Sequence, residues 1–143
     1  MLGQTTLDQL SAAAARFEAA HPQGRMTAIY SVQLNRACHE LGKDALERLR
    51  DRGWLDESEL DAFRALMHAM LIDAFRESDG ASGEAEANAF TERLLASLRD
   101  DFAGHRGFIR EYDEDDPEDP LDLTLAFVEN DTLHTLYIGI VFS

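Results

Sequence analysis

The chain has 143 residues, of which 45% are hydrophobic and 8% aromatic, a composition typical of a folded domain. Its formal net charge is −15, from 28 acidic and 13 basic residues. A field of this sign repels nucleic-acid phosphates and anionic lipids, so we expect neither nucleic acid nor a membrane among its partners.

The N-terminal residues and the cysteine content predict a cytoplasmic protein. Charged residues flank a run of four alanines near the N-terminus, and this pattern lacks the apolar core of a signal peptide. We find no stretch of the sequence that is long and apolar enough for a transmembrane helix. The lone cysteine, Cys38, cannot form an internal disulfide, which is typical of a reducing compartment.

The acidic excess lies in the C-terminal part of the chain. Residues 1–55 hold seven basic and six acidic residues, whereas residues 56–143 hold six basic and 22 acidic residues. The densest run lies within residues 113–120, where two prolines predict an extended, solvated acidic loop. Its carboxylates are Asp113, Glu114, Asp115, Asp116, Glu118 and Asp119.

Two helices are predicted in the first third of the sequence. Thr5 or Thr6 is a suitable N-cap for the first helix, which Pro22 ends. A second helix is expected from about Arg25, because large apolar side chains recur at helical spacing. These residues are Met26, Ile29, Tyr30, Leu34, Cys38 and Leu41.

Two further helices are predicted before residue 104. Asp56 and Glu59 form a capping-box pair at the start of the third helix, which is apolar over most of its circumference and is expected to be the most buried. After a Gly/Ser/Asp turn, a fourth amphipathic helix ends near Gly104. Its apolar face contains Ala87, Phe90, Leu94, Leu98 and Phe102.

The hydrophobic period changes to two from Leu121, which predicts a half-buried strand and a C-terminal β-hairpin. A two-residue turn at Asn130 and Asp131 would place four apolar pairs on one face. These pairs are Leu121 with Ile140, Leu123 with Ile138, Leu125 with Leu136, and Phe127 with His134. Residues 107–112 are a candidate third strand.

The predicted fold class is α+β, with four main helices followed by a C-terminal antiparallel β-hairpin or a three-stranded sheet. We expect one domain over residues 1–143. Within it, the helical part covers about 5–104, the acidic loop 113–120 and the hairpin 121–142.

No catalytic or cofactor motif is recognisable in the sequence. It contains no Gly-rich phosphate loop, no G-x-S-x-G motif and no cysteine pair, so we expect no cofactor and no metal. Cys38, His39 and Glu40 are adjacent on a predicted helix and therefore diverge rather than converge. An H-E-x-x-H zinc motif would begin at His39, but its last position is Lys43.

The remaining histidines have structural interpretations that are favoured over chemical ones. Asp101 and His105 are four residues apart, a spacing that suits a shared metal, but a histidine at a helix end more often complements the helix dipole. His68 and His134 are expected to be partly buried and hydrogen-bonded. The acidic run beginning at Asp113 matches a calcium loop poorly, because the position that requires glycine is Glu118.

The sequence favours a non-catalytic acidic binding protein, an inhibitor that occludes a basic toxin or enzyme in the cytoplasm, as bacterial immunity proteins and antitoxins do. Toxins that act on nucleic acids have basic clefts, and an acidic surface accelerates their capture. The six carboxylates of residues 113–119 are the predicted partner-binding residues. This hypothesis rests on charge and on analogy between classes of protein.

Other interpretations remain open. The acidity serves only solubility in one of them. In another, the chain is a small enzyme with a dispersed histidine and carboxylate site that uses His68, His39 or His134. A third class is an acidic secretion chaperone, or a homodimer in which the C-terminal strand exposes an edge to the partner. A pocket with a histidine and carboxylates would favour the enzyme.

Overall fold

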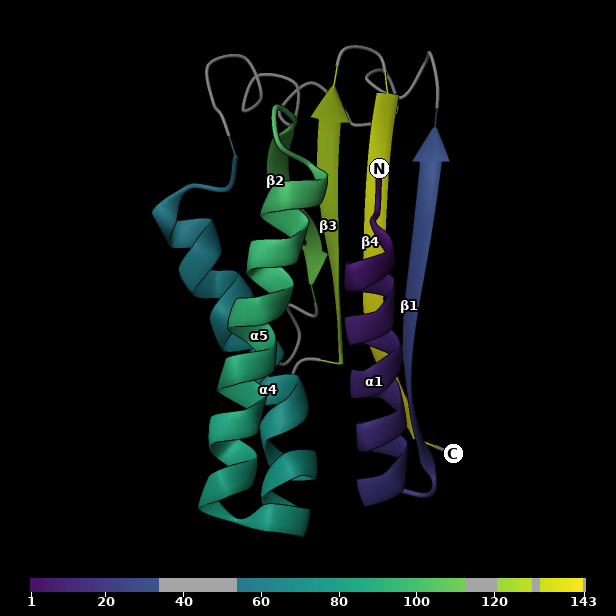
Figure 1. The fold of residues 1–143 in the computed structure, drawn as a ribbon, viewed down its shortest axis with the longest axis vertical. Coiled ribbons are helices and arrows are strands. Elements are labelled where there is room, and N and C mark those ends of the chain that lie inside the picture. The colour runs from purple at the N-terminus through teal and green to yellow at the C-terminus, as the bar shows by residue number, and fades with distance from the viewer. Residues whose placement is uncertain (34–53, 113–120, 130–131, 143) are drawn as a thin grey trace.

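Three helices cover one face of a four-stranded antiparallel sheet in a computed structural model that describes residues 1–33, 54–112, 121–129 and 132–142 (Figure 1). The helices are α1 (Gln4–Ala20), α4 (Glu57–Asp79) and α5 (Ala81–Asp101), and the strands are β1 (Gly24–Gln33), β2 (Arg106–Tyr112), β3 (Asp122–Glu129) and β4 (Thr132–Phe142). The strand order is β1-β4-β3-β2, so β4 and β3 are central and β1 and β2 are the edges.

The predicted hairpin is confirmed, together with its register. Leu123 pairs with Ile138, Leu125 with Leu136, and Phe127 with His134. Leu121 precedes the ladder, but its carbonyl accepts the N–H of Ile140 at 2.8 Å. The candidate third strand is also present as β2, with a register shift between Ile109 and Glu111. The turn expected at Asn130 and Asp131 lies outside the described residues.

The prediction of four helices followed by a hairpin is wrong, because the segment assigned to the second helix begins as strand β1. Its apolar residues fit both periods: Met26, Ile29 and Tyr30 suit a helix, while Met26, Ala28, Tyr30 and Val32 alternate as in a strand. Ten register pairs with β4 decide between the two, because each pair adds backbone hydrogen bonding that an isolated segment lacks. The continuation beyond residue 33 lies outside the described residues.

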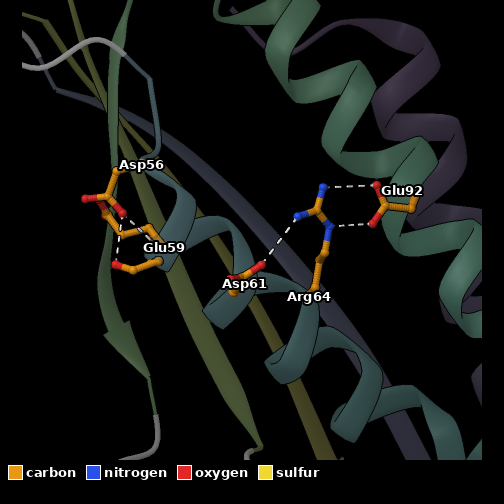
Figure 2. A network of polar contacts seen from close by, with 6 residues as sticks. Asp56, Glu59, Asp61, Arg64 and Glu92 are labelled. Atoms are coloured by element: carbon orange, nitrogen blue, oxygen red, sulfur yellow. Dashed lines mark hydrogen bonds and ion pairs between the residues drawn. The ribbon is translucent and has the colours of Figure 1, made fainter.

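The helix starts follow local capping, with one correction. Glu59 donates its backbone N–H to Asp56 Oδ1 at 2.8 Å, which confirms Asp56 as the cap of α4 (Figure 2). At α1, however, the N-cap is Gly3 and makes no side-chain cap bond. Thr6, one of the two expected caps, is instead a buried residue within the helix.

The core lies between the helices and the inner face of the sheet. Phe63, Met67 and Leu71 place the apolar face of α4 in this core, and all three side chains are fully buried. On α5, Leu94 and Leu98 are also fully buried, as expected for that helix. The inner residues of the hairpin, which are Leu123, Leu125, Phe127, Leu136 and Ile138, complete the same cluster. Burial of this apolar surface is the main stabilising contribution to the fold.

Strand β3 is more buried than its alternating pattern predicts. Thr124, Ala126 and Val128 point to the outer face, yet each is at most 9% exposed. On the same outer face, the ring of Tyr137 lies over Gly139, where an added Cβ would come within 2.6 Å of the ring carbon Cζ. A hydrophobic pattern with a period of two assigns these positions to solvent. They are buried because β3 is a central strand and because large side chains lie on the outer face.

None of the described helices is long and apolar enough to cross a membrane.

The register generates a stability prediction. Leu125→Asp and Ile138→Asp should each unfold the protein, because an unpaired carboxylate in this core costs several kcal/mol against a total stability of about ten. Val141→Asp is the matched control, because Val141 is 59% exposed and its register partner is Arg25. Thermal unfolding followed by circular dichroism measures all three. A cooperative melt like that of the wild type in either core variant would contradict the register.

Candidate functional site

Four polar side chains from separate segments meet at one end of the sheet, and we call them the histidine cluster: Tyr30 of β1, His105 after α5, Glu129 of β3 and His134 of β4. The Tyr30 hydroxyl lies 2.6 Å from His134 Nδ1. His105 Nε2 lies 3.1 Å from Glu129 Oε2. The two imidazole rings are 5.1 Å apart between centroids, in an edge-on arrangement. These contacts connect all four residues.

The pKa of the tyrosine in this cluster is shifted by its surroundings. The Tyr30 hydroxyl has a hydrogen bond with the backbone of Leu2, and this bond lowers the pKa of the tyrosine. Burial has the larger, opposite effect, so the pKa of Tyr30 is raised above 10.0 and the phenol remains protonated. The hydroxyl therefore carries a proton that it donates to His134 Nδ1 in the tautomer in which that nitrogen is unprotonated.

His134 is held in its neutral form. Burial lowers the pKa of His134 below its usual 6.5, and the N-terminal ammonium and His105 lower it further, whereas Glu129 raises it. A neutral imidazole has one acceptor nitrogen, which suits the bond from the Tyr30 hydroxyl. The cluster thus combines a neutral imidazole, a phenol and a carboxylate within a few ångströms.

Aromatic packing encloses both histidines. Phe102 stacks on Phe127 with centroids 4.2 Å apart, and the same Phe102 ring contacts His105 at 5.3 Å and His134 at 5.4 Å. His105 is 8% exposed and His134 is 7% exposed. The imidazoles consequently contribute apolar contact area to the core as well as hydrogen bonds.

The N-terminus is tied to the end of α5 beside the cluster. Asp101 Oδ2 accepts the backbone N–H of Gly3 at 2.9 Å and the hydroxyl of Thr6 at 2.5 Å. A carboxylate from another helix therefore takes the capping position of α1, where negative charge is favoured by the helix dipole. Asp101 and His105 have different partners, since His105 contacts Glu129. Among the described residues, no group of three or more metal-ligating side chains is present.

A groove separates α1 from β1. It has a volume of about 340 Å³ and is lined by side chains that include Leu7, Ser11 and Ala14 of α1 and Ala28 and Tyr30 of β1. Ser11 and Ala14 of α1 and Ala28 of β1 are small, and they leave space between the larger side chains of the lining. The histidine side chains of the cluster are not among its lining residues.

The six predicted partner-binding residues lie outside the described residues: Asp113, Glu114, Asp115, Asp116, Glu118 and Asp119. Their attachment points are described. Tyr112 of β2 and Leu123 of β3, which lie on either side of this segment in the sequence, are register partners. Cys38, His39 and Glu40 also lie outside the described part of the chain.

His68 is half-buried on α4, and its Nε2 lies 3.8 Å from Glu84 Oε1 of α5. A carboxylate thus lies near this histidine, although no acidic residue stands four positions away in the sequence. His134 occupies the predicted inner face opposite Phe127.

Sequence reasoning missed three members of the histidine cluster. The apolar pattern predicts a helix at Tyr30, whereas the structure places this residue on β1, beside β4. Glu129 is the last residue of β3 and pairs with Thr132, so the hairpin register alone could have located it near His134. His105 carries no sequence signal for its contact with Glu129.

Comparisons with models of protein families, with curated proteins and with solved structures find no match to this chain. Function must therefore be inferred from the residues themselves and from their geometry.

The lowered pKa of His134 predicts a pH dependence of stability. Below about pH 6.5 the unfolded chain binds a proton at His134 that the folded chain resists, so the free energy of unfolding falls as the pH drops. Between about pH 7.5 and about pH 5.5 the melting temperature of the wild type should fall more than that of His134→Asn. Most carboxylates stay ionised over this range, and any change that they cause in the melting temperature is the same in the two proteins. Equal pH slopes in the two proteins would contradict the assignment.

Proposed function

We propose that the chain is a non-catalytic acidic binding protein that occludes a basic surface of another protein, in the manner of an immunity protein or an antitoxin. The observation that carries the proposal is the charge: a net −15 with 22 of the 28 acidic residues after position 55. Such a field attracts a basic partner over several ångströms and raises the rate of productive encounter.

The net charge of the described residues supports this proposal. They include 17 acidic and eight basic residues, so this part alone has a net charge of −9. Several of the basic side chains are engaged within the fold. Arg16 of α1 binds Glu86 of α5 at 3.1 Å and lies over the Phe75 ring, and Arg99 lies over the Trp54 ring.

Arg64 is another basic residue that forms ion pairs within the fold. It extends from α4 toward α5, where its Nε lies 2.5 Å from Glu92 Oε1, and it also approaches Asp61 at 3.8 Å (Figure 2). Solvent-exposed pairs of this kind add little stability, and each paired cation neutralises one carboxylate, so the excess of acidic over basic residues is unchanged by the pairing. The carboxylate surplus is consequently available to a partner.

The acidic segment suits docking because of where it begins and ends. Both attachment points, Tyr112 and Leu123, belong to strands of the sheet, so the segment is presented from a rigid support. Pro117 and Pro120 restrict its backbone and reduce the entropy lost on binding. Contacts with a basic cleft can therefore form without rearranging the core.

Neutralising the acidic segment tests the proposal. We expect replacement of its six Asp and Glu residues by Asn and Gln to slow association with the partner roughly tenfold or more at low salt. The melting temperature should stay constant or rise, because repulsion within the segment is relieved. The partner is first captured from native cytoplasm, and association is then measured by biolayer interferometry at low and high salt.

The control removes two exposed carboxylates elsewhere, with Glu18→Gln on α1 and Asp61→Asn on α4, and the effects are compared per charge removed. These changes should alter association much less than the six-residue replacement. If association is insensitive both to salt and to the six replacements, the acidity serves solubility alone and the proposal fails.

A second candidate is a small enzyme centred on the histidine cluster. The observation that favours it is the convergence of Tyr30, His105, Glu129 and His134, since a neutral imidazole beside a phenol is suited to proton transfer. His105 Nδ1 is also buried with no hydrogen-bond partner among the described residues. A chemical activity that is lost in Tyr30→Phe at unchanged stability would favour this role over binding.

A further inference from the structure

Among the described strands, β1 is an edge of the sheet. β1 pairs with β4 on one side, and no described strand pairs with its other side. The C-terminal strand β4 lies between β1 and β3, so the edge that the sequence analysis assigned to the C-terminus is paired. Any strand added to this end of the sheet must therefore bind along β1.

The hydrogen-bond pattern identifies the backbone groups that point outward from β1. Ile140 donates its N–H to Leu121, toward β3, so its neighbour Gly139 points toward β1. Thr27 is the register partner of Gly139 and therefore bonds to β4. Because successive residues of a strand alternate, the N–H and C=O groups of the intervening residues face away from the sheet. These residues are Met26, Ala28, Tyr30 and Val32.

The two edges of the sheet differ in how well they are protected against the addition of another strand. The register of β2 is interrupted by a shift between Ile109 and Glu111, and an irregular edge of this kind opposes strand addition. β1 has no acidic residue, no proline and no register shift over its ten residues, and Arg25 is its sole charge. Natural sheets rarely leave so long and regular an edge unprotected unless it has a partner.

Exposed apolar side chains accompany this edge. Ile29 is 52% exposed and Val32 is 43% exposed, while Leu7 on the facing side of the groove is 41% exposed. Ala28 and Tyr30 line the groove and also provide outward backbone groups. A strand laid along β1 would cover Ile29 and Val32 and would direct alternate side chains toward the groove.

We propose that the occupant of this edge is a second copy of the chain, joined through antiparallel pairing of the two β1 strands. An antiparallel pair of identical strands obeys two-fold symmetry, and the outward groups of β1 are self-complementary in such a pair. With Ile29 opposite its own copy, Ala28 faces Tyr30 and Met26 faces Val32. Arg25 then faces Gln33, so no like charges are directly opposed.

The distribution of charge over the molecule favours this edge as the site of self-association. Two molecules that each carry −15 repel one another, and the repulsion is strongest where carboxylates face each other. β1 offers ten residues without a carboxylate, in the half of the chain whose net charge is close to zero. The two copies thus approach through the part of each molecule where the repulsion is least.

The oligomeric state tests the proposal directly. Sedimentation equilibrium should give a mass near twice the 16.0 kDa of the monomer at about 100 µM protein. Added salt should strengthen the dimer, because it screens the repulsion between the two acidic bodies. Salt should strengthen the dimer, whereas it should weaken a complex with a basic partner. The experiment can therefore contradict the dimer without contradicting the proposed function, and the reverse.

Ala28→Pro and Ala28→Val form a matched pair of variants. Proline removes an outward N–H and obstructs strand addition, whereas valine has a similar size and keeps the N–H. We expect Ala28→Pro to weaken dimerisation roughly tenfold or more and Ala28→Val to retain it. Ile29→Lys, at the proposed two-fold axis, should weaken the dimer while it keeps the backbone hydrogen bonds between β1 and β4. This variant tests the proposal if Ala28→Pro fails to fold.

Two outcomes would overturn the proposal. One is a mass of 16.0 kDa at every protein and salt concentration, which would leave the edge to a strand of a different protein. The other is a dimer whose affinity is the same in the wild type, in Ile29→Lys and in folded Ala28→Pro.

Discussion

The pairing of β1 with β4 is the interaction on which the rest of the structure depends. It joins segments at least 100 residues apart in the sequence and makes the last strand of the chain a central strand. It also brings Tyr30 to His134 and sets α1 beside the sheet, since α1 and β1 are joined by a short turn. The histidine cluster, the groove and the edge position of β1 all follow from this one long-range contact.

Local interactions explain which parts of the fold the sequence could predict. The hairpin was predictable because a period of two and a short turn fix the register between neighbouring segments. Asp56 could likewise be identified as a cap from residues three positions away. β1 was not predictable in this way, because Met26 and Tyr30 fit a helix as well as a strand, and the deciding partner lies at the other end of the chain.

The candidate site shows the same division. His134 could be placed on the inner face from the hairpin register, whereas Tyr30 and His105 reach it only through tertiary packing around Phe102. The acidic excess is visible in composition alone, because charge sums without reference to the fold. Long-range fields can thus be inferred from the sequence, while the geometry of a site built from four segments cannot.

Amide hydrogen exchange along β1 tests the central pairing most directly. The amides of Thr27, Ile29 and Ser31 are bonded to β4 in this fold, so their exchange should be slowed by opening of the sheet. Measured by two-dimensional NMR at neutral pH, these three amides are expected to be protected to the same degree as their partners in β4. Exchange at the rates of an unfolded chain at these three positions would contradict the pairing and, with it, the placement of Tyr30 beside His134.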